Sequence, residues 1–249
     1  MNNIVIEKEA SAFRLKNGLG ANDPIRLKSI LNNLDVVTVY KRLSGDFSGM
    51  ALKVNLNENN INRFILVNST HSLGKQHFTI CHELYHLYIQ KEFNAMVCKT
   101  GRFDKKDKEE YNADYFAAVL LLPETGVKAL IPNEELKKDK ITLKTILKIE
   151  HYYSCSRAAL LYRLEDLNII TKSYKDNFAT NVKYGALQHG YNTNLYSSGN
   201  DNLVIGNYGE IAYQLYENEK ISETYYYTLL KDLGLSDDEL QIIINGEES

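Results

Sequence analysis

The sequence predicts an α+β fold in which a small sheet is followed by helices. With 249 residues and 44% hydrophobic content, the chain can bury a core within one or two domains. Three short segments rich in β-branched and aromatic residues lie in the first third of the chain, at 35–40, 48–54 and 63–68. The apolar pattern then changes to longer runs of helix-forming residues, which indicates that helices follow the strands.

The elements before residue 70 are predicted from caps and turns. Residues 10–34 predict helices interrupted near 17–18 and again at Asp23-Pro24, with Asp23 as the cap and Pro24 as the first helical residue. The first strand is followed by a turn at 44–46, and the Asn-rich segment 57–62 joins the second and third strands. We therefore expect three strands in front of the first long helix.

That helix carries the most informative motif of the chain, His82-Glu83-Leu84-Tyr85-His86. Two histidines four residues apart project from one helix face, where they can share a metal ion at roughly 2.0–2.1 Å per bond. Glu83 follows the first histidine, so its carboxylate can reach a water molecule on that ion. The flanking residues from 78 to 89 are mostly apolar, and burying three polar groups among them calls for a common partner. The pattern is typical of zinc-dependent peptidases.

A second helix is expected to supply the third metal ligand. Residues 109–123 are rich in helix formers and end at Pro123, which a helix interior does not accept. Glu110 and Asp114 are four apart and share a face, so we predict Glu110 as the ligand. Asp114 is then placed to accept the free ring N–H of one ligand histidine. Glu109 is the alternative ligand, although it shares a face with Ala113 instead.

Together, residues 78–87 and 110–123 resemble the ImmA/IrrE family of metallo-endopeptidases, which are bacterial and phage proteins that inactivate helix-turn-helix repressors by proteolysis. The sequence departs from the family pattern at Cys81, Tyr85 and Asp114, where the family has a small residue, Gly and Asn. The last difference makes the site more similar to gluzincins.

The resemblance implies a zincin-like fold, Zn²⁺ as the metal with Mn²⁺ as the alternative, and Glu83 as the catalytic base. It also implies that the substrate is a helix-turn-helix (XRE-type) repressor, whose cleavage derepresses mobile-element or stress genes. His71, Tyr85 and Tyr115 are the candidate oxyanion stabilisers, and the sequence does not choose between them. An edge strand is expected to hold the substrate in extended form through Val54 or a neighbour in 48–54, and the sequence does not say which residue.

We predict three parts: a zincin-like metallopeptidase domain at 1–130, a helix-turn-helix-like helical segment at 131–174, and a mainly helical C-terminal extension at 175–249. In the second part, helices at 141–149 and 157–167 are joined by a tight turn, with Ser154 or Ser156 as the cap of the second. In the third, helices are expected at 208–218 and at 222–233, where Gly234 ends the chain's last predicted helix.

Two other functions remain open at this point. The chain could be a non-proteolytic, zinc-containing anti-repressor that binds and displaces the repressor. It could also be a DNA-binding regulator that uses residues 141–170. Direct nucleic-acid binding is disfavoured, because Arg157 and Arg163 in the second helix are balanced by Glu165 and Asp166.

Composition excludes several further classes. The chain has no apolar stretch of 18 or more residues, so we expect no membrane span, and its N-terminus lacks the pattern of a secretory signal. Its three cysteines stand at unrelated spacings and predict no disulfide framework, which favours a cytoplasmic location. A net charge of −3 argues against nonspecific binding to nucleic acid.

Overall fold

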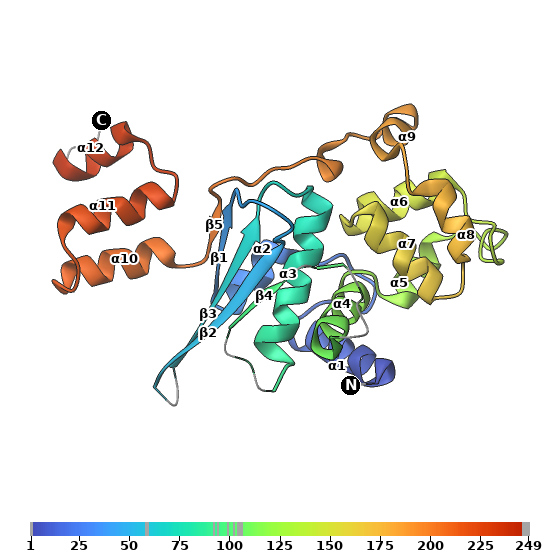
Figure 1. Ribbon diagram of the computed structural model, residues 1–249, viewed down its shortest axis with the longest axis horizontal. Helices are drawn as coiled ribbons and strands as arrows, with labels where there is room; N and C mark the ends of the chain where they lie inside the picture. Colours follow the sequence, from blue (N-terminus) through green and yellow to red (C-terminus); the bar gives the residue numbers. More distant parts are fainter. Residues whose placement is uncertain are drawn as a thin grey trace.

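The structure is a computed structural model that describes residues 2–57, 60–91, 93, 95–98, 100–101, 103 and 107–245. Within these residues, five strands form one sheet in the order β4-β2-β3-β1-β5, and helices surround it, which confirms the predicted α+β class (Figure 1). The strands are β1 (Val36–Lys41), β2 (Gly49–Asn57), β3 (Asn60–Asn68), β4 (Ala95–Cys98) and β5 (Val204–Ile205). β1 and β3 run parallel, and the other pairs are antiparallel.

The N-terminal helices differ from the prediction in where they begin. Helix α1 spans Asn3–Lys16 with Asn2 as its cap, and α2 spans Leu27–Asn33, so Pro24 is not the first residue of a helix. The reason is Arg14, whose buried guanidinium donates to the carbonyl oxygens of Gly20 and Asp23. The chain between the two helices therefore curves around this guanidinium as a loop before α2 begins.

The inner face of the sheet packs against helix α3 (Leu73–Tyr88), which carries the H-E-x-x-H motif. Ala51, Ile65 and Val67 on that face are fully buried, whereas Phe64 and Leu66 on the opposite face are half-buried. This alternation follows from the two-residue period of a strand. It explains why the sequence pattern located the three central strands.

The edge beside α3 is not the strand that we predicted. Strand β4 pairs with β2 from Gly49 to Leu52, so the edge position there belongs to β4 and the prediction for residues 48–54 was wrong. Val54 lies beyond the paired residues and is 39% exposed. Four residues are too few to give β4 a recognisable two-residue period, which is why the pattern missed it.

Helix α4 (Lys108–Leu121) packs against both α3 and α1. Asp107 caps it, because its carboxylate accepts from the backbone N–H groups of Glu109 and Glu110. The helix ends two residues before Pro123, as predicted. This cap fixes where α4 begins, so Glu109 and Glu110 lie in its first turn.

A helical region follows α4. It comprises α5 (Glu124–Leu130), α6 (Leu143–Tyr153), α7 (Arg157–Asp166), α8 (Lys172–Lys175) and α9 (Val182–Gln188), with single 3₁₀ turns at 176–178 and 194–196. Of the two cap candidates, Ser156 caps α7 through Ala159 N–H, while Ser154 ends α6 in a left-handed conformation. A Cβ at Gly74 would lie 2.6 Å from Ser156 N, so the first turns of α3 and α7 are in close contact.

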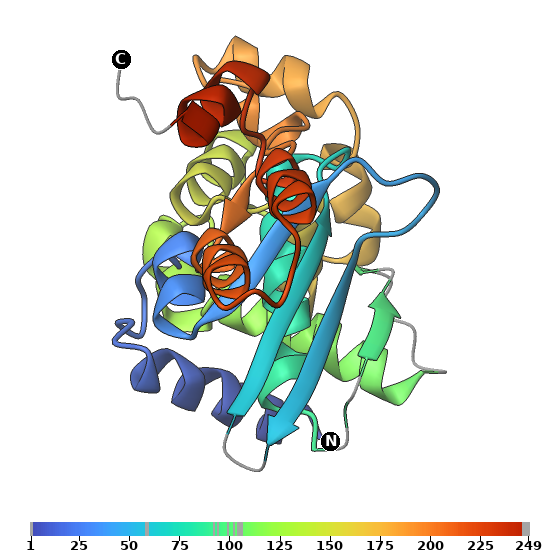
Figure 2. The same cartoon turned by 90° about the vertical axis from the view of Figure 1, so that its left-hand side faces the viewer.

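After α9 the chain returns to the sheet and then forms a separate helical unit (Figures 1 and 2). Strand β5 pairs with β1 through Thr38 and Val39, and Ile205 is buried in the main core, so the predicted C-terminal extension begins by completing the sheet. Helices α10 (Tyr208–Glu217), α11 (Glu223–Asp232) and α12 (Asp237–Asn245) then enclose a small core of their own. The sequence predicted α10 and α11 but not α12. Within the described residues, no helix is both long and apolar enough to cross a bilayer.

Candidate metal centre

Three potential ligand atoms converge between α3 and α4. The Nε2 atoms of His82 and His86 lie 3.1 Å apart, and the Glu110 carboxylate oxygens lie 3.5 Å from the first and 3.3 Å from the second. Ligands about 2.0–2.1 Å from a tetrahedral ion are themselves roughly 3.3 Å apart. The observed separations therefore match a single small cation.

Two further side chains fix which ring nitrogen of each histidine faces that point. His82 Nδ1 lies 2.9 Å from Asp114 Oδ1, and His86 Nδ1 lies 2.6 Å from Gln90 Oε1. Both partners are acceptors, so in each neutral ring the Nδ1 atom carries the proton. The Nε2 lone pairs are left facing each other and the Glu110 carboxylate, an arrangement that repels itself unless a cation lies between them.

The Glu110 carboxylate stays ionised in this setting. Burial raises its pKa, whereas hydrogen bonds and positive charge from His82 and His86, present when these rings carry a proton on Nε2, hold the pKa well below its ordinary value; a bound cation would take the place of those protons. Both histidine side chains are fully buried, and the Glu110 side chain is 19% exposed. The donor set of two neutral imidazoles and one carboxylate fits zinc, so these residues can hold the metal that the motif implies.

Asp114 connects the metal centre to the loop that follows β4. Besides His82, it accepts from the backbone N–H of Gly101 and of Phe103, each at 2.7 Å. The sequence predicted its contact with a ligand histidine but not these two contacts. An asparagine, which has only one carbonyl oxygen, would turn an NH₂ group toward one of the backbone donors. A carboxylate at this position can therefore accept from both backbone N–H groups while it also contacts His82.

Glu83 is fully buried on the side of α3 that faces β2. A Cβ built at Gly49, the first residue of β2, would lie 2.9 Å from Glu83 Oε1 and 2.5 Å from Thr79 Cγ2. Glycine at 49 thus leaves the room that the carboxylate occupies. No sequence pattern indicated this role, because it depends on how closely the strand approaches the helix.

The two glutamates at the start of α4 face different partners. Glu109, the alternative ligand, accepts from the Tyr85 hydroxyl at 2.8 Å and lies 3.4 Å from Asn112 Nδ2. Glu110 faces the histidines. The structure therefore brings Glu110, and not Glu109, to the candidate metal position.

Within the part of the chain that the structure describes, the three candidate oxyanion stabilisers contact partners other than the three ligand atoms, although the Tyr85 ring packs edge to face on His86. The Tyr85 hydroxyl donates to Glu109, and the Tyr115 hydroxyl donates to Glu7 of α1 at 2.7 Å. His71 precedes α3, more than two helical turns from His82, where its Nε2 lies 3.4 Å from Lys75 Nζ. Burial, and then the nearby Lys75 ammonium, lower the pKa of His71.

Sequence reasoning also missed two neighbours of His86. Gln90 lies four residues after His86, just beyond the end of α3, and Phe93 stacks on the His86 ring with 5.3 Å between ring centroids. The spacing of Gln90, four residues after a ligand histidine, was a signal that could have been used. Phe93 lies outside any regular element, so no periodicity pointed to it.

The comparison with protein families agrees with this geometry. The model of the IrrE N-terminal-like domain, an M78 peptidase family, matches residues 32–165, which is more than half of the chain. The chain belongs to this family. The matched range contains both helices that carry the candidate ligands, α3 and α4. The match confirms the resemblance seen in the sequence and supports a metallopeptidase-type function for this chain. A comparison with curated proteins found no match.

Proposed function

We propose that this protein is a zinc-dependent endopeptidase and that its substrate is a cytoplasmic helix-turn-helix repressor. The observation that carries the hydrolytic part is the convergence of His82, His86 and Glu110 at tetrahedral separations, with Glu83 buried beside them. The repressor part is supported by the family resemblance of the two ligand-bearing helices.

The side chains have separate roles in this proposal. Zinc, when bound, polarises the scissile carbonyl and lowers the pKa of a coordinated water toward ~7. His82, His86 and Glu110 hold the ion, while Asp114 and Gln90 fix the two imidazoles in the Nδ1–H tautomer. Glu83 accepts the proton of the attacking water and then transfers it to the nitrogen of the departing amine, so the C–N bond breaks without leaving an amide anion.

The contacts of the helix-turn-helix-like segment, α6 and α7, argue against direct DNA binding through the two arginines of α7. Arg157 is 5% exposed and is paired with the buried Glu150, and Arg163 is 1% exposed and contacts Asp166 and the Leu122 carbonyl. Buried, paired guanidinium groups cannot neutralise phosphates. Among the described residues, α7 instead packs against α3 and α4, the helices that carry the candidate metal ligands.

The test combines the purified protein with a purified helix-turn-helix repressor, with zinc, with manganese and with a chelator. We expect mass spectrometry to find repressor fragments with metal and none with chelator or with Glu83→Gln. A repressor that leaves its operator DNA while remaining intact would instead support the non-proteolytic anti-repressor.

Adjacent glutamates provide a matched pair for the metal. We expect Glu110→Gln to lose bound zinc and Glu109→Gln to keep it, as measured by elemental analysis of the dialysed proteins. Retention of zinc by Glu110→Gln, with loss from Glu109→Gln, would reverse the ligand assignment.

A further inference from the structure

A cavity of about 730 Å³ lies between α3, α7, the loop after β4 and the arm that contains α8 and α9. We call it the α3–α7 pocket. Its lining includes Lys75 and Phe78 of α3, Phe103 of the loop, and Ala158 and Tyr162 of α7. Cavities of about 300–1,000 Å³ are typical of ligand sites in proteins. The pocket therefore has room for more than one side chain of a ligand.

Two α3 residues that line the pocket, Lys75 and Phe78, lie on the helix face that carries the metal ligands. At about 100° per residue, Lys75, Phe78, His82 and His86 fall within about 80° of one another around the axis of α3. Along that axis, Phe78 precedes His82 by about 6 Å and Lys75 precedes it by about 10 Å. A chain lying across the metal centre would thus reach the pocket in about two to three extended residues, at about 3.3 Å each.

The loop wall of the pocket is fixed by the metal centre. Gly101 and Phe103 line the pocket, and both donate backbone hydrogen bonds to Asp114, which also contacts His82. Thr100, a third lining residue, lies 3.1 Å from Thr79 through the two hydroxyl oxygens. The pocket and the candidate metal position are therefore neighbours that share one loop.

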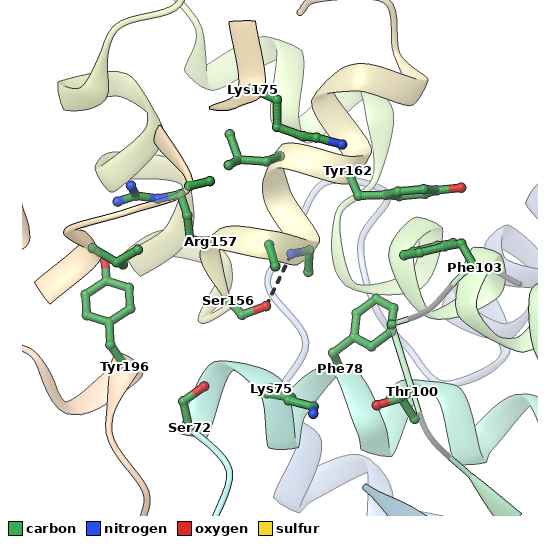
Figure 3. Close-up of a pocket in the computed structure, with 16 residues that line it drawn as sticks. Ser72, Lys75, Phe78, Thr100, Phe103, Ser156, Arg157, Tyr162, Lys175 and Tyr196 are labelled. Atoms are coloured by element: carbon green, nitrogen blue, oxygen red, sulfur yellow. Dashed lines mark hydrogen bonds between the residues drawn. The ribbon is translucent and has the colours of Figure 1, made fainter. Parts of the chain in front are cut away.

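The chemistry of the lining favours an apolar occupant. Figure 3 shows Phe78, Phe103 and Tyr162 grouped on one side of the cavity, where the rings of Phe103 and Tyr162 stack and those of Phe78 and Phe103 meet edge to face at 6.1 Å. Such a wall binds a flat apolar group well. The charged residues among the described lining are Lys75, Arg157 and Lys175. Arg157 and Lys175 are paired with Glu150 and Glu165, so the lining offers no carboxylate of its own to a basic group, and Lys75 adds a positive charge that disfavours one.

We propose that the α3–α7 pocket is a specificity pocket that binds a bulky apolar side chain of the substrate, aromatic by preference, two or three residues from the scissile bond. As a subsite, it rests on the proposed endopeptidase function. Substrates with Lys or Arg at that position are expected to be poor.

Two alanines allow a matched test. Ala158 is exposed at the start of α7 and lines the pocket, while Ala12 is exposed on α1 and does not line it. The chain contains no Trp, so Ala158→Trp and Ala12→Trp each introduce a single fluorescent reporter. We expect the emission of Ala158→Trp to be shifted to shorter wavelength relative to Ala12→Trp, because its indole fills the apolar pocket. Equal emission maxima would show that the pocket does not take an indole.

Binding is measured without catalysis. Zinc-loaded Glu83→Gln is immobilised and exposed to a randomised decapeptide library, and the retained peptides are sequenced. We expect enrichment of Phe, Tyr, Trp and Leu and depletion of Lys and Arg. Introducing Ala158→Trp into the Glu83→Gln protein should reduce this enrichment by about tenfold or more, which is the scale of a lost hydrophobic contact in a subsite. Adding Ala12→Trp should leave it unchanged.

Cleavage of the same library by the wild-type protein then locates the preference relative to the cut. An aromatic preference two or three residues from the cut, weakened by Ala158→Trp alone, supports the pocket. Retention and cleavage that do not respond to Ala158→Trp, or that favour Lys and Arg, overturn it. Pocket-dependent retention without any wild-type cleavage would overturn the proposed hydrolysis while leaving the pocket as a peptide-binding site.

Discussion

Replacing Gly49 by alanine tests whether the position of the Glu83 carboxylate limits the rate. The added Cβ would meet Thr79 Cγ2 at 2.5 Å and Glu83 Oε1 at 2.9 Å. Carbon atoms pack at about 3.5–4.0 Å, so strand and helix must separate by about 1 Å. Thr79 cannot relieve the contact by rotating, because its hydroxyl is hydrogen-bonded to Lys75 O and lies 3.1 Å from the Thr100 hydroxyl.

A shift of that size has two measurable effects. Misplacing a catalytic group by 1 Å costs on the order of 100-fold in rate, so kcat on a cleaved peptide should fall by about that factor while bound zinc stays the same. Overpacking costs about 1–3 kcal/mol, which lowers Tm by about 2–12 °C in a chain of this size.

The control is Gly185→Ala, in the interior of α9, where the nearest atom to the new Cβ is Leu143 Cδ2 at 3.2 Å. It should leave kcat unchanged. A Gly49→Ala protein with wild-type kcat and Tm would refute the reasoning. A Gly49→Ala protein that has lost zinc would show that the substitution disturbs the metal ligands and not the Glu83 carboxylate alone.

Three further predictions follow from the same contacts. Tyr85→Phe should leave the rate unchanged and cost about 1–3 kcal/mol in thermal unfolding, because it removes the hydroxyl that contacts Glu109 and Asn112. A rate loss of about 100-fold would instead support Tyr85 as an oxyanion stabiliser. Asp114→Asn should weaken zinc binding about 10- to 100-fold in competition with a chelating dye, and an unchanged affinity would show that the charge is not needed. A chain ending at Gly199 should be less stable than one ending at Asn207 by at least about 1.5–3 kcal/mol, since it loses the buried Ile205 and also the hydrogen bonds of Asp201 with Ser69 and of Leu203 O with Tyr40 N. Equal Tm values would count against a structural role for β5.

The parts of the site that the sequence predicted are those encoded by spacing along one chain segment. His82 and His86 are four residues apart on a helix, as are Glu110 and Asp114, and helical geometry alone places each pair on one face. The structure brings the three ligands together, and their binding of metal stays a prediction until metal is measured. The family match reaches the same fold class independently.

What the sequence could not supply depends on distances between separate elements. The choice between Glu109 and Glu110 follows from the rotation of α4 relative to α3, which depends on the packing of α4 against α3 and α1 and on the Tyr85–Glu109 contact. Gly49 matters only because β2 passes close to α3. The start of α2 moved from Pro24 to Leu27 because the neighbouring loop satisfies Arg14, a tertiary contact that overrides the local helix-start signal.

The pairing of β5 with β1 has a consequence for how the protein is made. Thr38 pairs with Ile205, which is 205 − 38 = 167 residues further along the chain. At about 5–20 residues per second, synthesis leaves that edge of the sheet unpaired for roughly 10–30 s. Both ligand-bearing helices have been synthesised before then, so a nascent chain can assemble the metal centre while β1 still exposes a strand edge prone to association. The late strand closes that edge, so chaperone demand should fall sharply once residue 205 has left the ribosome.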